Sequence, residues 1–521
     1  SRIALSVPVA LVTFLTARGF LRPPLMCTLM SRLCLVVFAG WIACLWPAGS
    51  LMGGAQLTLV EDGVGRAIIE VAVQPSPSAR LAARELQYFV ERVSGARLPI
   101  VGKPDLAGVC LVPHGARPDP AAERADARTL GLKRYEHAII FRDGRVNLLG
   151  HDAAASTGVE IDYAAATSAG GVPERILLPG MFDDQGTLRA AYDFLERFCG
   201  VRFYGPATVS VAYPDKRTLQ VAGDDVRREP SIPNISGSLT WRWPLMNGQY
   251  GNPSDDALRL YERRMRLGGI PWYANHTLHR YPERFPRERH PEFYAEGGGG
   301  KLCYSAAALA SQVAQDARDY FDGKTVPDLT LPQGSDYYPV VPEDAARFCQ
   351  CDSCRRWLDP HANDLPRTPS GRPLFNDGRS SHLWFSFINR VARELKRTHP
   401  DKYISTLAYE SYYWYPTAFR LDPNVAIAPC MQVRNYWHMA SYANELGHYS
   451  RWVSDGRPVF LWNYYCFPEE PAVINRWHCF PGFSAHELAK LARRYARDGV
   501  LGTFFCGIGE QVDFYVTAKL Y

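Results

Sequence analysis

The chain has 521 residues, of which 47% are hydrophobic and 21% are charged, so it can bury more than one core. Its formal net charge is only +5, and no run of lysines and arginines forms a basic patch, which argues against nucleic acid as a partner. Aromatic residues make up 12% of the chain, a content that suits large cores and sugar-stacking surfaces alike.

The first 55 residues are expected to be a leader outside the fold. Met30 opens a short basic stretch, residues 34–46 are apolar, and residues 47–55 are rich in small side chains. This order is typical of a secretory signal peptide, and the apolar run is short for a membrane span. We therefore expect a true start at Met30 and a secreted, periplasmic or cell-surface protein without a stable membrane span. A true amino-terminal membrane anchor is the alternative.

Residues 56–226 are predicted to form a small α+β domain. Strands are predicted at residues 57–60, 67–73, 109–112, 138–141 and 146–149, the last two joined by a tight turn at Asp143 and Gly144. An amphipathic helix is predicted at residues 78–95, with Ser78 as its cap and Gly95 as its end. A second helix is predicted at residues 187–198.

Residues 227–233 contain Pro230 and Pro233 and are predicted to be a linker. Beyond it, helices are predicted at residues 305–321, 383–398 and 486–498, and strands at residues 403–409, 425–428, 459–464 and 500–505. Repeated strand and helix units of this spacing indicate an α/β fold, and we expect residues 227–521 to form a (β/α)8 TIM-type barrel. Because the chain stops inside an expected helix, we also expect a missing carboxy-terminal part.

The most informative segment is residues 403–415. An apolar, β-branched run ends at Glu410, which stands among six aromatic residues, including Tyr409, Tyr412 and Trp414. A carboxylate at the carboxyl end of a barrel strand is typical of a catalytic residue, and aromatic faces stack on sugar rings. We predict Glu410 as a catalytic carboxylate and the three named aromatics as sugar-binding residues. The alternative is a buried strand with core aromatics and a solvated Glu.

Two stretches carry a family resemblance. Residues 186–206 look like the end of the small domain that precedes the barrel in β-hexosaminidases and α-glucuronidases. The cysteine-rich residues 348–354, the helix predicted at residues 383–398 and residues 399–409 together resemble DUF4838 domain proteins, which are secreted, bacterial and glycoside-hydrolase-like. The resemblance covers roughly residues 56–521 and implies the fold more strongly than the chemistry.

A partner carboxylate for Glu410 is less well defined. Similar proteins carry an Asn-Asp pair ahead of the cysteines, and Ser335 and Asp336, after the apolar residues 329–331, come closest to it. Glu343 is a rival for this role, and a turn-capping Asp is the alternative for Asp336. Glu510 follows a late strand and a glycine-rich turn, so it is a further candidate at the barrel rim.

Three polar or aromatic residues are predicted to bind substrate beside these carboxylates. His276 lies in an aromatic loop where similar proteins carry a His, so it is expected to hydrogen-bond a sugar hydroxyl or carboxylate; an ordinary loop His is the alternative. Trp462 and Asn463 end another strand. The family more often shows Asp after this Trp, so Asn463 is expected to bind rather than to transfer protons.

The sharpest local motif is Cys349-Gln-Cys351-Asp-Ser-Cys354. It could bind Zn²⁺ if a fourth ligand such as His361 came from nearby. In an exported protein a disulfide from Cys354 to Cys351 or Cys349 is equally open. A structural role is expected over a catalytic one, and no metal ligand is assigned.

These features predict a secreted glycoside hydrolase-like protein that cleaves glycosidic bonds in a polysaccharide or glycan. Glu410 would act as general acid, with Asp336 or Glu510 as base or nucleophile. No organic cofactor is expected, because no glycine-rich loop of the phosphate-binding form occurs. A non-catalytic carbohydrate-binding protein on a degenerate barrel is the alternative.

Overall fold

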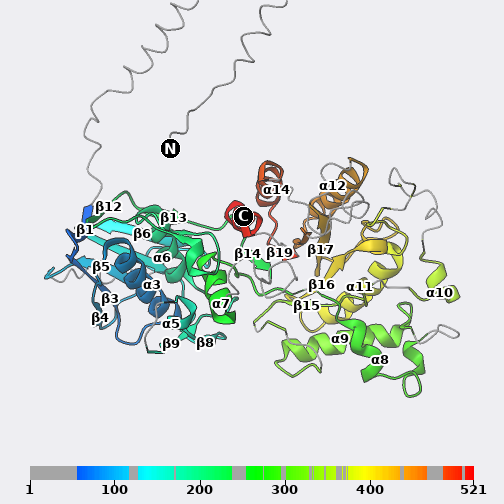
Figure 1. The fold of residues 1–521 in the computed structure, drawn as a ribbon. Coiled ribbons are helices and arrows are strands. Elements are labelled where there is room, and N and C mark those ends of the chain that lie inside the picture. Colours follow the sequence, from blue (N-terminus) through cyan, green and yellow to red (C-terminus); the bar gives the residue numbers. More distant parts are fainter. Residues whose placement is uncertain are drawn as a thin grey trace, which may run out of the picture. The chain divides into compact units, whose positions relative to one another are not determined.

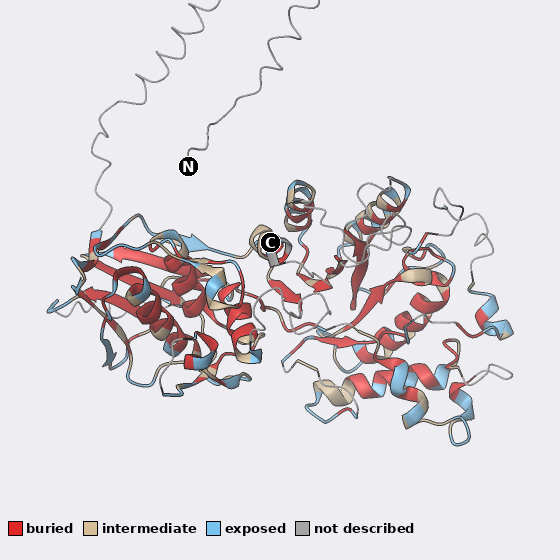
Figure 2. Cartoon of the chain, in the orientation of Figure 1, coloured by how far each residue is buried: buried red, intermediate tan, exposed pale blue. Residues whose placement is uncertain are grey.

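The computed structural model (Figure 1) describes residues 56–116, 127–168, 172–237, 254–273, 275–294, 301–327, 331–332, 334–344, 348–358, 367, 371, 374–433, 439–465, 485–506 and 511–521. Residues 55–521 form one compact unit with two main sheets, one in the amino-terminal region and one in the carboxy-terminal region. Figure 2 shows that the strands of both sheets are largely buried.

The amino-terminal sheet has six strands in the order β13-β6-β7-β5-β3-β4. Their bounds are β3 (Ala67–Ala72), β4 (Ile100–Lys103), β5 (Val109–Pro113), β6 (His137–Arg142), β7 (Arg145–Gly150) and β13 (Val226–Arg228). Helices α3 (Pro77–Ser94) and α6 (Gly186–Arg197) pack on each other and on this sheet. The strands and helices expected from the sequence in this region are therefore confirmed, including the β6–β7 turn, where Asp143 and Gly144 both adopt positive φ.

Smaller elements complete the amino-terminal region. A three-stranded sheet has the order β12-β1-β2, and two further pairs of strands are β8-β9 and β10-β11. The bounds are β1 (Gln56–Glu61), β2 (Val64–Gly65), β8 (Val159–Asp162), α5 (Tyr163–Ala166), β9 (Arg175–Leu178), β10 (Arg202–Phe203), η2 (Thr208–Ser210), β11 (Val211–Ala212) and β12 (Leu219–Ala222).

Two expectations about this region need correction. The cap of α3 is Ser76 rather than Ser78, because the Ser76 hydroxyl accepts a hydrogen bond from the N–H of Ala79 at 3.0 Å and Pro77 fills the first helical position. The predicted linker also begins later than expected. Val226–Arg228 is strand β13, which pairs with β6, so residues 227 and 228 belong to the sheet.

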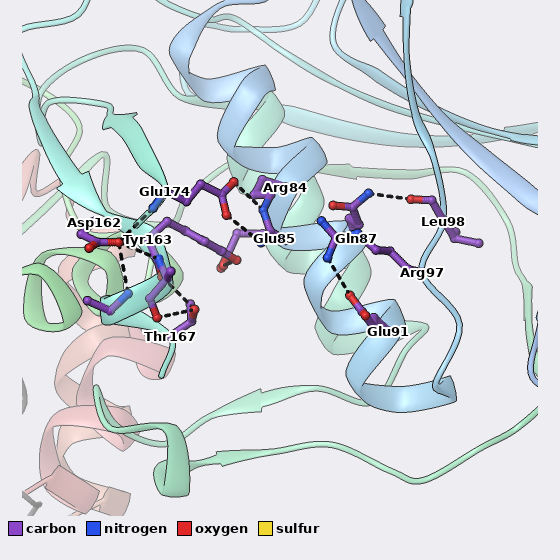
Figure 3. Close-up of polar contacts among 12 residues, drawn as sticks. Arg84, Glu85, Gln87, Glu91, Arg97, Leu98, Asp162, Tyr163, Thr167 and Glu174 are labelled. Carbon is purple, nitrogen blue, oxygen red and sulfur yellow. Dashed lines mark hydrogen bonds and ion pairs between the residues drawn. The ribbon is translucent and has the colours of Figure 1, made fainter. Parts of the chain in front are cut away.

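A polar network around α3 is shown in Figure 3. Arg84 makes two hydrogen bonds to Glu174, at 2.7 and 2.8 Å. The hydroxyl of Tyr163 donates to Glu85, which is fully buried and also accepts two bonds of 2.8 Å from Arg264 on α7 (Asp255–Arg264). This buried pair links α3 to the first helix described in the carboxy-terminal region.

The carboxy-terminal sheet has the order β14-β19-β18-β17-β16-β15, and every neighbouring pair is parallel. Its strands are β14 (Asn234–Gly237), β15 (Tyr337–Pro339), β16 (Tyr403–Ala408), β17 (Val425–Gln432), β18 (Phe460–Tyr464) and β19 (Gly502–Cys506). Helices occur between them: η3 (Leu278–Arg280), α8 (Tyr281–Arg284), η4 (Pro291–Phe293), α9 (Ala307–Phe321), α10 (Asp352–Arg355), α11 (Ser381–Lys396), η6 (Glu410–Tyr412), α12 (Met439–Ser454) and α14 (Ala485–Arg497), with α15 (Gln511–Leu520) after β19. The predicted alternation of strands and helices is confirmed.

This parallel sheet is strongly curved. Phe460 on β18 lies with its ring centroid 5.0 Å from that of Tyr337 on β15, although β17 and β16 stand between them in the sheet. Strands in a flat sheet are about 4.8 Å apart, so rings three strands apart meet only if the sheet bends round on itself. The described strands form this half-barrel; closure into eight strands stays a prediction. Within the described residues, no helix combines the length and the apolar character that crossing a membrane requires.

Candidate active site at the carboxyl edge of the parallel sheet

Glu410 lies directly beyond β16, at the carboxyl edge of the parallel sheet. Its backbone has φ = 45°, a left-handed conformation that costs a residue other than glycine about 1–3 kcal/mol. Two hydrogen bonds hold it there: its N–H donates to Oδ1 of Asn376 at 3.1 Å, and its carbonyl accepts from the N–H of Asp377 at 2.8 Å. The surrounding structure therefore holds the backbone of Glu410 in this conformation.

The electrostatic setting of Glu410 favours its protonated form. Burial raises the pKa of Glu410, and the negative charges of Asp344 and Asp377 raise it further, while Arg379 opposes them. Among the described residues, no side chain forms a hydrogen bond or ion pair with the Glu410 carboxyl group. A carboxyl group in this setting keeps its proton to higher pH than an ordinary glutamate, as a general acid requires.

The loop before α11 supports Glu410 through Asn376 and Asp377. The buried Asn376 amide donates 3.0 Å bonds to Oε1 of Glu445 and to the carbonyl of Cys430, which leaves its Oδ1 facing the N–H of Glu410. Asp377 is buried and pairs with Arg379 at 2.9 Å. Burial raises the pKa of Asp377, and Arg379 opposes that rise.

His276, Asp344 and Tyr409 meet beside Glu410. The Tyr409 hydroxyl donates to Oδ1 of Asp344 at 3.3 Å, and Nε2 of His276 lies 3.4 Å from the same oxygen. Nδ1 of His276 lies 2.6 Å from the carbonyl of Pro342, so it carries the proton of that bond. Nε2 is therefore the ring nitrogen that faces the Asp344 carboxylate.

Aromatic rings border these polar groups. The Tyr409 ring lies 6.2 Å from that of Tyr464, 6.0 Å from that of His276 and 5.5 Å from that of Phe375. Tyr409 itself is buried, whereas Phe375 is 38% exposed. An exposed ring next to the carboxyl groups offers an apolar face for a sugar.

The candidate partner carboxylates lie in different places. Asp336 comes before β15 rather than after a strand, pairs with Lys402, and so lies at the amino edge of the sheet, opposite Glu410. Glu343 follows β15 but is exposed and lies 3.7 Å from Lys301. Glu510 lies outside the described residues, as do residues 329 and 330 of the predicted preceding strand. The structure does not bring Asp336 together with Glu410; it brings Asp344 there.

Tyr412 and Trp414 have structural surroundings rather than the exposed faces expected of sugar-binding residues. Tyr412 is 1% exposed, with its ring against Phe348 and Trp384. Trp414 packs against Gly378, where an added Cβ would meet the indole at 2.5 Å, and its Nε1 donates to Asn444. These two side chains therefore pack in the protein interior around the segment that carries Glu410.

Trp462 and Asn463 point to opposite faces of β18. Trp462 is buried and packs on Phe504, with ring centroids 4.2 Å apart. Asn463 is fully buried, and its amide donates to Thr503 at 2.8 Å and to the Tyr521 hydroxyl at 3.4 Å. Asn463 therefore faces the α15 side of the sheet, and the next residue, Tyr464, is the one that approaches Tyr409.

Sequence reasoning missed Asp344, Asn376, Asp377 and Phe375. A usable signal existed for Asp344, because an apolar run through Val341 ends in the acidic pair of Glu343 and Asp344, as the β16 run ends in Glu410. Asn376 and Asp377 form an Asn-Asp pair, but this pair follows the cysteine cluster rather than preceding it.

A cavity of about 600 Å³ lies away from this edge, lined by residues of both regions. Several of its charged side chains are paired with one another: Asp193 bonds His137 at 3.2 Å and both Arg197 and Arg228 at 2.9 Å. Although burial opposes it, the hydrogen bond from His137 and the charges of nearby arginines lower the pKa of Asp193. We assign these charges a structural role.

The edge of the sheet thus gathers Glu410, Asp344, His276 and aromatic rings on an α/β scaffold. Residues 207–518, more than half of the chain, match the family described as "Domain of unknown function (DUF4838)", and the chain belongs to this family. No curated protein matches the chain.

Among solved structures, the chain is similar to a family 89 glycoside hydrolase from Clostridium perfringens in two complexes. The complex with PUGNAc is 9% identical, with a TM-score of 0.38, and the complex with 2-acetamido-1,2-dideoxynojirmycin is 10% identical, with a TM-score of 0.39. Both alignments cover 85% of this chain and 48% of the other, so the chain spans about half the length of these structures.

Proposed function

We propose that the chain is a glycoside hydrolase-like protein that cleaves glycosidic bonds with Glu410 as its general acid. The observation that carries this proposal is the half-buried Glu410 carboxyl group at the carboxyl end of a parallel strand, with its pKa raised by burial and by two acidic neighbours. A protonated carboxyl group can donate a proton to the glycosidic oxygen as the bond breaks.

Asp344 is the second carboxylate in this proposal. It is exposed, with 69% of its side chain reached by solvent, whereas Glu410 is half-buried. Two carboxyl groups in contrasting environments are the arrangement that separates an acid from a base or nucleophile. Tyr409 and His276 both contact Asp344 and would hold it in place.

The sugar would lie over the edge of the sheet, between Phe375 and the polar groups of His276 and Asp344. The exposed Phe375 ring supplies the apolar contact, and the imidazole supplies a hydrogen bond to a hydroxyl or carboxylate of the substrate. This placement keeps His276 as a substrate-binding residue, gives Tyr409 the role of holding Asp344, and replaces Tyr412 and Trp414 with Phe375.

The first test is release of reducing sugar from a panel of glycans by the parent, Glu410→Gln and Glu61→Gln. Glu61 is the control, because it is exposed on β1 of the amino-terminal region and pairs with Arg66. Activity in the parent and the control, with a loss of about 10²–10⁴-fold in Glu410→Gln, supports the proposal. Equal activity in all three proteins excludes Glu410 as the acid. Glycan binding without turnover in the parent supports the carbohydrate-binding alternative.

The wider organisation is proposed on the sequence. Residues 56–226 would be a separate small domain, residues 227–521 would belong to a TIM-type barrel, and residues 1–55 would direct secretion and be removed. Expression from Met30 in a bacterial host, with mass spectrometry of the exported protein, tests the last point. An uncleaved amino terminus in the membrane fraction would favour an anchor instead.

A further inference from the structure

Four cysteines converge at a point that the proposed reaction does not use. Cys303 lies just before α9, whereas Cys349, Cys351 and Cys354 lie in and around the short α10 that precedes α11. Their Sγ atoms all lie within 4.8 Å of one another. Over the part of the chain that the structure describes, no other group of three or more Cys, His, Asp or Glu side chains is gathered in this way.

The sulfur spacing fits a tetrahedral metal ion. The Sγ atom of Cys303 lies 3.8 Å from that of Cys351 and 3.7 Å from that of Cys354. A Zn²⁺ ion with bonds of about 2.3 Å to four thiolates separates neighbouring sulfurs by about 3.8 Å. Two edges of the cluster therefore already have the length that the ion requires.

The immediate surroundings also suit thiolate ligands. The backbone N–H of Cys351 donates to Sγ of Cys349 at 3.4 Å, and the Ser305 hydroxyl lies 3.1 Å from Sγ of Cys354. Cys303, Cys349 and Cys354 are buried, and Cys351 is half-buried. Hydrogen bonds to the sulfurs and exclusion of water are what a closed structural site needs.

We propose that Cys303, Cys349, Cys351 and Cys354 bind a single Zn²⁺ ion as a closed, structural site. Four sulfur donors in tetrahedral spacing select zinc over the oxygen-seeking Mg²⁺ and Ca²⁺. Cys303, supplied by a distant segment, takes the place for which the sequence suggested His361, a residue outside the described part of the chain.

The ion would fix the packing behind the candidate active site. Tyr304, next to Cys303, and Phe348, next to Cys349, pack edge to face with ring centroids 5.5 Å apart. Phe348 also contacts Tyr412 at 5.9 Å, and Tyr412 shares η6 with Glu410. A metal that holds the two segments together therefore stabilises the aromatic packing around η6, the element that carries Glu410. It would take no part in the reaction.

The test is metal analysis of the full chain, purified without chelators, beside Cys303→Ser and Cys199→Ser. Cys199 is the matched control, because it is a buried cysteine of the amino-terminal region far from the cluster in sequence. We expect one zinc per chain in the parent and the control and loss of zinc in Cys303→Ser. Stoichiometric zinc in all three proteins would place the ion elsewhere and overturn the proposal.

Thiol mapping on the parent keeps the proposal testable if Cys303→Ser does not fold. The protein is denatured with a chelator but no reductant, alkylated and digested. We expect alkylation of all four cysteines, because zinc leaves thiols behind when it is removed. Recovery of disulfide-linked peptides among these four cysteines would overturn the metal site. A Co²⁺-substituted protein without the absorption of a tetrahedral thiolate complex would also overturn it.

Discussion

Asp193 in the amino-terminal region and Glu410 at the edge of the parallel sheet are both at least partly buried, but their charged neighbours have opposite signs. Asp193 contacts three basic side chains, and its pKa is lowered despite burial. Glu410 has the acidic residues Asp344 and Asp377 nearby, and its pKa is raised by burial and by their charges. The comparison separates a carboxylate held in its charged form by basic neighbours from a carboxyl group whose surroundings favour the protonated form.

The same contrast applies to Glu85. Glu85 is fully buried but receives two hydrogen bonds from Arg264 and one from Tyr163, so its charge is compensated. Burial alone therefore does not distinguish Glu410 among the carboxyl groups that the structure describes. Glu410 differs from Glu85 in its acidic neighbours and in its place at the carboxyl end of a strand.

The largest expected effect is on catalysis by Glu410→Gln. Loss of the proton donor should lower kcat/KM by about 10²–10⁴-fold on glycosides with poor leaving groups. Glycosyl fluorides, whose leaving group departs without protonation, should be cleaved at nearly the parental rate. The measurement is the ratio of the two rates in the parent and the variant. An equal loss on both substrates would assign Glu410 a role other than general acid.

The next effect is on stability, through Glu85→Gln. The variant leaves the Arg264 guanidinium buried without its counter-charge, and we expect the free energy of unfolding to fall by about 3–5 kcal/mol. Urea unfolding measures the change. Glu91→Gln on the same helix is the control, because its pair with Arg97 is exposed and should contribute about 1 kcal/mol or less. Similar losses in both variants would remove the distinction between compensated buried charges and surface pairs.

A smaller effect is expected on the pH profile of Arg379→Gln. The Arg379 charge lowers the pKa of Glu410, so its removal should raise that pKa and keep the acid protonated to higher pH. The decline of kcat at high pH should therefore move to higher pH. Arg397→Gln, at the end of α11, is the control and should leave the profile in place. If this decline moved to lower pH in Arg379→Gln, it could not be assigned to the deprotonation of Glu410.

The smallest effect is a gain in stability. Because the pKa of Glu410 is raised by folding, the native state holds more protons than the unfolded state between the two pKa values, and the free energy of unfolding falls as pH rises through that window. Glu410→Gln removes the free-energy cost of ionising this carboxyl group in the folded protein, so the variant should be more stable than the parent at neutral pH. At low pH, where Glu410 is protonated in both the native and the unfolded state, the variant should be no more stable than the parent. Thermal unfolding across pH measures the difference. A variant less stable at neutral pH would show that the carboxylate stabilises the fold.

The sequence predicted β16 and Glu410 because the relevant signal is local. An apolar run followed by a carboxylate defines both a strand and its end within a few residues. Asp344 and Asn376 were missed because they reach Glu410 through the fold, from segments 66 and 34 positions away in the chain. No local sequence pattern indicates that segments so far apart in the chain lie close together in the fold.

Two other predictions differ from the geometry of the structure. Asp336 comes directly before strand β15 (Tyr337–Pro339), so it lies at the amino edge of the sheet, opposite Glu410. Asn463 and Tyr464 differ by one position, which in a strand turns the side chain to the other face, and Tyr464 is the one that approaches Tyr409. The sequence therefore did not predict where each strand begins or which face of the sheet each side chain points to, and both are needed to predict this site.

The left-handed backbone of Glu410 has a consequence for how relatives of this chain can diverge. Glycine and asparagine adopt that conformation at lower cost, so substitution there would relieve strain while removing the acid. Descendants under no selection for turnover should drift to those residues. If Glu410 is the general acid, relatives that retain glutamate at this position should be enzymes. Relatives with glycine or asparagine there should bind sugars without cleaving them.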